Sequence, residues 1–297
     1  MIYTCVMRNI IILLMLIVKI SYAQIISENC FKANDKSRIV SAGGSITEII
    51  YLLEEEDNTV AIDVTSVYPE DANKKPSIGY VRNLSAEGIL SMSPTLIIGE
   101  DDMGPPNIIT QLKKLGIDVK IVEEIQSSEG IIEKIKCVGK ILDIEEKSNQ
   151  IIKEQMYPSI EELDKISSIK GMEEKKVMLI LSMKGSSPIV AGKNTSGDSF
   201  IKMVGAKNIY DSIDGWQTVS EESIINYNPD FIILPERELH KNSNVNSIRT
   251  NSIFANTEAG KRDNFISDDG MAILGFGPRT IFSALRTAKI ISQQVKQ

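Results

Sequence analysis

Short apolar runs alternate with helical stretches along the chain from about residue 38. Apolar runs typical of buried strands lie at 39–41, 59–63, 95–99 and 119–122. Between them, the capping box Ser45-Ile46-Thr47-Glu48 predicts a helix that runs to about Leu53. Pro105-Pro106 predicts another, which Gly116 ends. Alternating strands and helices indicate parallel β-α-β units with helices on both faces of a sheet.

The stretch from about 129 to 166 has a different pattern. It is long, charged and helical in spacing, and Pro158 is the only residue in it that would be expected to interrupt a helix. A helix of ~20 residues spans ~30 Å, far more than a turn between neighbours needs. The alternation then resumes, with strands predicted at 177–181 and 231–234 and helices at 195–204 and 279–293. The sequence predicts an α/β fold, a bilobal clamshell whose parts are residues 24–140 (N-terminal lobe), 141–170 (interlobe helix) and 171–297 (C-terminal lobe).

An internal sequence repeat, which we call the echo, supports two related lobes. Residues 84–98 and 219–233 align without a gap at an offset of 135, and Ser, Glu, Ile, Pro, Ile and Ile coincide. Each copy reads as a Ser-capped short helix followed by a Pro-led turn and a buried strand. Any cap–helix–turn–strand unit has this general look, but six coincidences at one offset favour duplicated lobes.

The N-terminus reads as a secretory signal. Arg8 precedes an apolar run over 9–18, and Ser21-Tyr22-Ala23 gives a small-residue cleavage pattern. A membrane anchor, the alternative, would need ~20 apolar residues. We expect residues 1–23 to be removed and the mature protein to reach the periplasm.

Composition narrows the class of protein. The 297 residues include 33 Lys+Arg, 40 Asp+Glu, one His and three Cys, for a net charge of −7. An acidic chain without a basic run argues against nucleic acid as a partner. One His and scattered Cys exclude zinc fingers and iron–sulfur frameworks. Phosphate-loop and Gly-x-Ser-x-Gly motifs are absent, which favours binding over turnover.

Two cysteines, Cys30 and Cys137, follow the signal. Export permits a disulfide, but Cys137 lies in a helical apolar pattern where a buried free thiol is the simpler interpretation. We expect no bridge.

Five segments resemble the substrate-binding proteins of bacterial haem ABC importers, and the resemblance covers nearly all of 37–293. The most specific are Ser66-Val-Tyr-Pro69 and Gly79-Tyr-Val-Arg-Asn-Leu-Ser-Ala-Glu-Gly88; the others are 38–48, 191–195 and 275–279. Cobalamin- and siderophore-binding relatives share the architecture but match these two segments less well. The resemblance implies a ligand held between two lobes.

By this resemblance Tyr68 supplies a phenolate oxygen to ferric haem iron, a hard ligand for a hard ion. Arg82 would pair with a haem propionate, and Tyr80 would stack on the macrocycle. Gly44 and Ser45, at a helix start, form an anion site or only a tight turn.

The second lobe offers weaker candidates. Arg237 follows a strand and would face the cleft. Met183 stands where some relatives carry a ligating His, and His240 reads as surface loop. We therefore expect five-coordinate iron with Tyr68 as the ligand and one haem, with Met183 or His240 as open alternatives for a sixth ligand.

Glu87 and Glu222 are the acids repeated by the echo, and in the family such a pair docks onto two permease subunits. The alternative is a solvated acid favoured by the helix dipole. The expected function is a monomeric periplasmic protein, not an enzyme, that delivers haem to an inner-membrane ABC permease dimer, downstream of an outer-membrane haem receptor. A cobalamin or siderophore carrier and an exported α/β enzyme are the alternatives.

Overall fold

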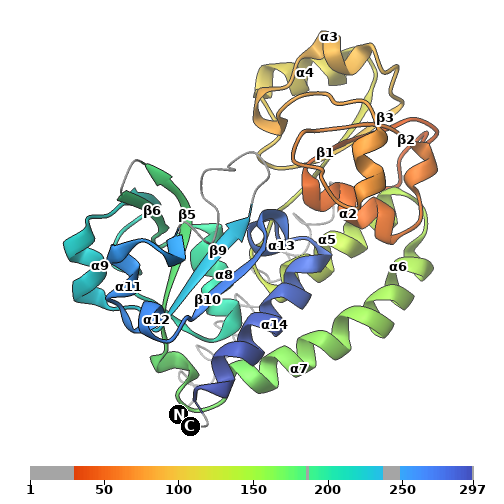
Figure 1. Ribbon diagram of the computed structural model, residues 1–297. Coiled ribbons are helices and arrows are strands. Elements are labelled where there is room, and N and C mark those ends of the chain that lie inside the picture. The colour runs from red at the N-terminus through yellow and green to blue at the C-terminus, as the bar shows by residue number, and fades with distance from the viewer. Residues whose placement is uncertain (1–29, 185–186, 237–247, 296–297) are drawn as a thin grey trace, which may run out of the picture.

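The computed structural model describes residues 30–184, 187–236 and 248–295. It consists of two α/β lobes joined by a long helical segment (Figure 1). The predicted signal at 1–23 and the candidates Arg237 and His240 lie outside the described residues. No helix in the described part of the chain is long and apolar enough to cross a membrane.

The N-terminal lobe is built on a four-stranded parallel sheet in the order β2-β1-β3-β4. Its strands are β1 (Ile39–Ala42), β2 (Thr59–Ile62), β3 (Leu96–Glu100) and β4 (Asp118–Val122). All four were predicted, to within a residue or two at each end. Helices cover both faces, as β-α-β connections require: α2 (Gly44–Leu52), α3 (Ala86–Leu90), α4 (Pro106–Lys114) and α5 (Ser128–Ile141).

The predicted capping box at the start of α2 does not form. The helix begins at Gly44, and its N-cap is Gly43 at φ 125°, without a side-chain cap. The Ser45 hydroxyl donates to a Glu100 carboxylate oxygen instead. Glu48 pairs with Arg279 of the other lobe. Both polar side chains of the expected box are therefore used in tertiary contacts.

The C-terminal lobe has a mixed sheet in the order β10-β9-β5-β6-β8, with β7 beside one end of β5. The centre is parallel and the β6 and β8 side is antiparallel. Its strands are β5 (Lys176–Lys184), β6 (Ser187–Ala191), β7 (Lys207–Asn208), β8 (Trp216–Thr218), β9 (Phe231–Glu236) and β10 (Phe265–Asp269). Its helices are α8 (Ser196–Val204), α9 (Glu221–Tyr227), α11 (Ser252–Ala255), α12 (Glu258–Lys261), α13 (Gly270–Leu274) and α14 (Pro278–Gln293).

The connecting segment is α6 (Glu145–Ile151), a π-helical turn (Ile152–Met156) and α7 (Tyr157–Ser167) in one continuous run. The π turn comes just before Pro158, which has no N–H to give to the regular ladder. The preceding helix α5 ends at Ile141, and Asp143 at φ 57° separates the two.

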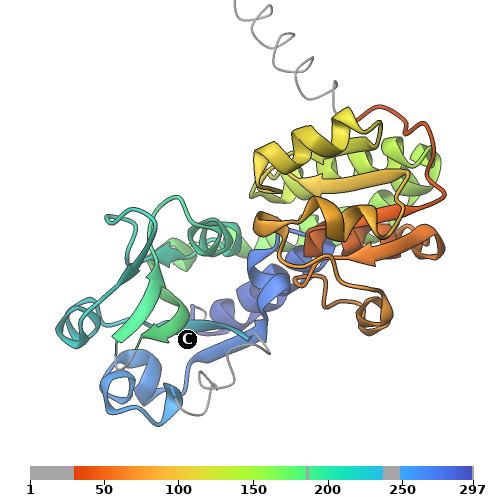
Figure 2. The same cartoon turned by 90° about the horizontal axis from the view of Figure 1, so that it is seen from above.

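The largest apolar cluster of the described residues extends through both lobes, and each lobe has a further cluster of its own. The largest cluster joins Ile46 and Ile135 of the N-terminal lobe to Val177, Phe200 and Ile281 of the C-terminal lobe. Helix α14 packs against α7 and also touches α2 and α5. Seen from above, α13 and α14 lie between the two lobes (Figure 2). The lobes are therefore packed against each other on one side as well as linked by α6 and α7.

The expectation of unpaired cysteines is wrong. Cys30 and Cys137 form a disulfide, with a Cα–Cα distance of 5.0 Å. Cys137 does lie on the apolar side of α5, 6% exposed, as its helical spacing suggested. The chain that follows Cys30 runs back along that helix, where the Ala33 N–H donates to the Ile141 carbonyl over 2.9 Å. The apolar spacing placed Cys137 correctly on the buried side of its helix. It carried no information on the N-terminal segment that brings Cys30 next to that helix.

The internal echo is a structural repeat. The Ser85 and Ser220 hydroxyls cap α3 and α9 by accepting from the N–H three residues on. Ser93 and Asn228, which are equivalent, both take the left-handed conformation, at φ 48° and 46°. Strands β3 and β9 then follow, each paired in parallel with the first strand of its own sheet. Sequence and backbone agree that the two lobes repeat this unit.

Candidate ligand-binding site

Asp63 anchors the loop that carries Tyr68. The side chain is 1% exposed and follows β2 at the carboxyl end of the sheet. Its carboxylate accepts four hydrogen bonds of 2.7–3.0 Å, from the Gly43 N–H, the Thr65 N–H and hydroxyl, and the Ser66 hydroxyl. A carboxylate bonded in this way fixes the start of the loop.

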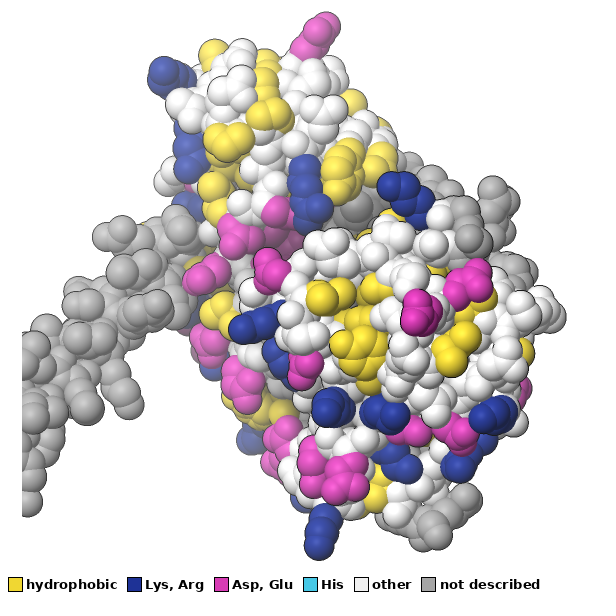
Figure 3. Space-filling model, turned by 90° about the vertical axis from the view of Figure 1, so that its left-hand side faces the viewer, with side chains coloured by type: hydrophobic (Ala, Val, Ile, Leu, Met, Phe, Trp, Pro, Cys, Tyr) yellow, Lys and Arg dark blue, Asp and Glu magenta, His cyan; other side chains and the backbone are white. Residues whose placement is uncertain are grey.

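The two loops after β2 expose an apolar surface. The Val64 N–H donates to the Gly79 carbonyl over 2.9 Å, so the loops lie side by side. They carry four large, exposed apolar side chains, which we call the Tyr68 surface: Val64 (45% exposed), Val67 (37%), Tyr68 (46%) and Tyr80 (44%). From the C-terminal-lobe side, hydrophobic and basic side chains are adjacent on the N-terminal lobe where it borders the other lobe (Figure 3). Clustered apolar exposure of this kind marks a binding surface.

Arg82 is held beside Tyr80. Its Nε lies 2.8 Å and its Nη2 2.7 Å from Asp102 Oδ2, and its Nη1 donates to the Tyr80 hydroxyl over 3.2 Å. The side chain is 62% exposed. The guanidinium is thus oriented by two neighbours and still faces water.

Tyr68 lies where the two lobes meet. The guanidinium carbon of Arg279, from α14 of the C-terminal lobe, is 3.9 Å from the centroid of the Tyr68 ring. This is a close cation–π contact. The sequence prediction included Tyr68 but not Arg279, which appeared only as the last residue of the 275–279 segment.

Arg279 is also the centre of a partly buried ion-pair network between the lobes. Its Nε and Nη2 donate to Glu48 Oε1 over 3.0 and 2.6 Å, and its Nη2 reaches Asp269 Oδ1 at 3.0 Å. Burial raises the pKa of Glu48 in spite of the opposing effect of Arg279. The network therefore fixes Arg279 above Tyr68 at the cost of burying a carboxylate.

Gly44 and Ser45 do not belong to this surface. Both are buried. The Gly44 N–H already donates to the Thr65 hydroxyl over 3.1 Å, and the Ser45 hydroxyl is bonded to Glu100 and Lys134. A Cβ on Gly44 would lie 2.7 Å from the Thr65 carbonyl, so the glycine allows close packing of two loops. The polar groups of this turn are thus bonded within the protein, and a ligand-binding role for Gly44 and Ser45 stays a prediction.

A buried charge cluster lies behind this turn, and the sequence prediction missed it. Lys134 of α5 is fully buried, with its Nζ 2.5 Å from Glu100 Oε1 and 3.4 Å from Glu124 Oε2. Burial and the nearby Glu100 charge raise the pKa of Glu124 to about 7. The Gln126 amide donates to Glu124 and accepts from the Ser199 hydroxyl of α8, which links the cluster to the C-terminal lobe. The available signal was a lysine on the apolar side of a predicted helix.

The remaining candidates lie apart from Tyr68. Met183 is in β5, where it pairs with Pro188 and packs partly buried against the C-terminal-lobe core. Glu87 and Glu222 are exposed on α3 and α9. Among the described residues, no group of three or more His, Cys, Asp or Glu side chains could hold a metal ion.

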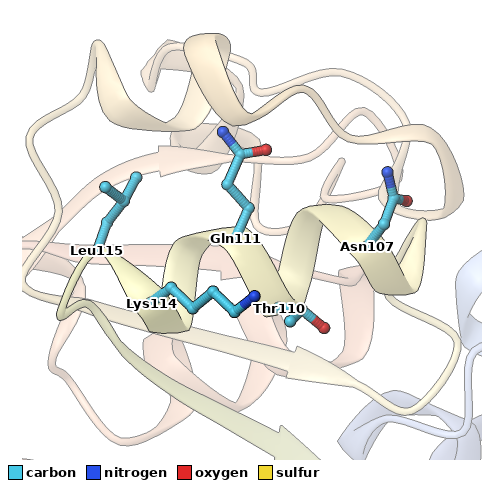
Figure 4. Close-up of a pocket in the computed structure, with 5 residues that line it drawn as sticks. All are labelled: Asn107, Thr110, Gln111, Lys114 and Leu115. Atoms are coloured by element: carbon cyan, nitrogen blue, oxygen red, sulfur yellow. The ribbon is translucent and has the colours of Figure 1, made fainter.

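Two hollows lie away from the Tyr68 surface. One, of about 330 Å³, borders the disulfide and Lys134. The other, of about 500 Å³, is lined by α4 and the residue that follows it: Asn107, Thr110, Gln111, Lys114 and Leu115 (Figure 4). A lining from a single helix with one charged side chain offers little to fix a ligand.

Two α/β lobes, a connecting helix and an exposed apolar surface at their junction define a bilobal solute-binding protein. The family model described as periplasmic binding protein matches residues 39–272. The chain therefore belongs to the periplasmic binding protein family.

Three relatives illustrate the range of similarity. The structure of the apo periplasmic haem-binding protein RhuT from Roseiflexus sp. RS-1 superposes with a TM-score of 0.79 at 31% identity, covering 89% of this chain and all of that one. An uncharacterised ABC transporter substrate-binding lipoprotein, YvrC of Bacillus subtilis, is 28% identical over 67% of this chain and 63% of its own length. The vitamin B12-binding protein of Pectobacterium atrosepticum is 23% identical over 66% of this chain and 71% of its own.

Proposed function

We propose that the protein binds haem on the Tyr68 surface and delivers it to an ABC importer of the inner membrane. The observation that carries this proposal is Tyr68 itself: an exposed phenol on an apolar surface, with the Arg279 guanidinium 3.9 Å from its ring centroid. Haem is a flat apolar ring with a central Fe(III) and two carboxylates. The apolar surface, the Tyr68 phenolate and the exposed Arg82 guanidinium match these three features in turn.

In this proposal the Tyr68 oxygen is the iron ligand. Its ring is held from one side by the Arg279 guanidinium. Val64, Val67 and Tyr80 supply apolar contact area for the macrocycle. Arg82, fixed by Asp102 and still exposed, is the propionate partner. Arg237 stays a predicted contributor from the second lobe.

Cobalamin is the second candidate ligand. Proteins described as vitamin B12-binding match this chain at 21–25% identity, and structures of haem-binding proteins match it at 21–33%. Cobalamin already carries its own axial base below the corrin. A protein phenolate is therefore more useful for ferric haem, which arrives without one.

The test of the ligand is a spectroscopic titration with the Tyr68→Phe variant. Ferric haem should bind the wild-type protein at one equivalent and give a high-spin phenolate spectrum. Tyr68→Phe keeps the ring under Arg279, so the free energy of unfolding should change by at most ~1 kcal/mol. Haem affinity should fall at least tenfold with loss of the charge-transfer band.

Tyr157→Phe is the matched control, because Tyr157 is 43% exposed on α7. It should titrate like wild type. An unchanged spectrum and affinity in Tyr68→Phe would place the iron ligand elsewhere. Tighter binding of aquocobalamin than of ferric haem would overturn the choice of ligand.

Delivery is proposed to depend on Glu87 and Glu222, which are exposed near the start of equivalent helices in the two lobes. A permease of two like subunits presents two like basic sites, and one acid would reach each. The mature protein is proposed to be a periplasmic monomer, released by cleavage after residue 23 and supplied by an outer-membrane haem receptor.

The double variant Glu87→Gln/Glu222→Gln should titrate with haem like wild type and bind the importer weakly. We expect each acid to contribute about 2 kcal/mol, and added NaCl to weaken the wild-type complex. Glu161→Gln/Asp164→Asn on α7 removes the same charge from another exposed helix face and is the control. Normal importer ATPase stimulation by the Glu87/Glu222 variant would refute the docking role.

A further inference from the structure

The repeated helices expose an aliphatic side chain as well as an acid. Leu90 is 37% exposed on α3, and Ile225, its equivalent at the same offset of 135, is 51% exposed on α9. Each follows its acid by three residues, so Glu87 and Leu90 share one helix face and Glu222 and Ile225 share another. We call these two sets the acid–aliphatic pairs.

The two pairs are displayed by the same local structure. The residue before each aliphatic side chain, Ile89 or Ile224, is fully buried and ties its helix to the lobe. The same serine cap precedes each pair, and the same left-handed turn follows it. Exposure repeats as well: positions 85, 87, 90 and 91 are exposed, as are 220, 222, 225 and 226. The two lobes therefore present one surface twice.

Both acids are free for a partner. Neither Glu87 nor Glu222 takes part in an ion pair between residues of the described ranges. Helices α3 and α9 lie at the outer ends of the two lobes (Figure 1). An acid beside a water-exposed aliphatic side chain is complementary to a basic residue beside an apolar pocket. Because the surface occurs twice, the fitting partner offers that combination twice, as a twofold-symmetric dimer does.

We propose that Leu90 and Ile225 are apolar anchors for the permease: each inserts into an apolar pocket of one of two like subunits, beside the basic residue that receives Glu87 or Glu222. This rests on the proposed function, since it assumes that the acids dock on the importer. Burial of the exposed part of an aliphatic side chain contributes enough to change affinity about tenfold. The anchors supply affinity that salt does not screen, and the acids supply orientation and steering.

The experiment compares Leu90→Gln/Ile225→Gln with wild type for binding to the purified importer complex of the source organism in lipid nanodiscs, at 50 and 300 mM NaCl. Gln keeps helix propensity and volume and removes the apolar surface. We expect about a hundredfold weaker binding for the double variant and about tenfold for each single variant. The ratio of affinities at the two salt concentrations should stay at its wild-type value. Ile290→Gln, an exposed aliphatic position on α14 (39% exposed), should bind normally.

The outcomes separate this inference from the proposed function. Wild-type binding by Leu90→Gln/Ile225→Gln, together with weak and salt-insensitive binding by Glu87→Gln/Glu222→Gln, would overturn the anchors and leave acid docking in place. Normal binding by the acid variant would overturn acid docking, and with it the arrangement proposed here. A full loss from one single variant and none from the other would contradict the twofold partner. Haem titration of every variant reports on the ligand proposal independently.

Discussion

The cluster around Lys134 makes stability depend on pH in a way that one substitution can test. One buried ammonium is shared by Glu100, 2.5 Å away, and Glu124, 3.4 Å away. Two carboxylates beside a single ammonium group leave one uncompensated negative charge in the protein interior. Burial, and then repulsion by Glu100, therefore raise the pKa of Glu124 from 4.5 to about 7. Replacing Glu124 by Gln removes the excess charge and keeps an amide beside Gln126.

The direction in which stability changes with pH follows from proton binding at Glu124. Between pH ~4.5 and ~7 the folded state binds a proton at Glu124 that the unfolded state has lost, so the free energy of unfolding falls as pH rises through this window. A shift of this size corresponds to at most about 3 kcal/mol. Glu124→Gln should therefore be about 2 kcal/mol more stable than wild type at pH 8. At pH 4.5 the two should be equally stable.

The measurement is urea unfolding from pH 4.5 to 8, followed by circular dichroism and by fluorescence of the single tryptophan, Trp216. The quantity of interest is the variant minus the wild type, because the raised pKa of Glu48 gives both proteins a common pH dependence. Glu100→Gln removes the nearer partner of Lys134 and should destabilise by about 3 kcal/mol at neutral pH. Parallel stability curves for Glu124→Gln and wild type would show that Glu124 carries no excess charge, and would refute the reasoning.

Two further substitutions test the disulfide and the interlobe ion pair. Cys137→Ser opens a loop closed across 107 residues, and by chain entropy it should lower the free energy of unfolding by about 4–5 kcal/mol. The measurement is the urea midpoint under oxidising conditions. A loss below about 1 kcal/mol would mean that the bridge to Cys30 does not restrain the unfolded chain. Arg279→Met leaves the buried Glu48 carboxylate without its partner and should cost about 3–5 kcal/mol in thermal unfolding. Adding Glu48→Gln should recover most of that loss, whereas additive costs would show that the two side chains act independently.

Periodicity and turn residues predicted most of the fold, because each predicted element was specified locally. The four strands of the N-terminal lobe and helix α14 needed only an apolar run and a Gly or Pro boundary. Strand β6 was missed. It contains Pro188, which has no N–H to donate and argues against a strand with neighbours on both sides, yet β6 lies between β5 and β8.

The candidate site was predictable where local motifs carry its residues and not where two distant segments meet. Tyr68, Tyr80 and Arg82 belong to local motifs. Arg279 and Glu48 are 231 residues apart, and no spacing rule relates them. The Ser45–Glu48 spacing satisfied a capping box, but tertiary partners outcompete a local cap when both side chains are buried.

The repeated and the unique parts of the two lobes correspond to the two tasks proposed for the protein. The acid–aliphatic pairs stand on the repeated unit, which each lobe builds with the same cap, turn and parallel strand. The Tyr68 loop follows β2, a parallel partner of β1. On the corresponding side of β5 in the other lobe, the two-residue parallel strand β7 lies at one end and the antiparallel strand β6 follows it. Among the described residues, the C-terminal lobe meets the Tyr68 ring through Arg279 of α14. One unsymmetrical ligand needs a single set of contacts, while a twofold partner needs two like ones. A duplicated chain that diverged on the ligand side and stayed alike at its outer ends meets both requirements.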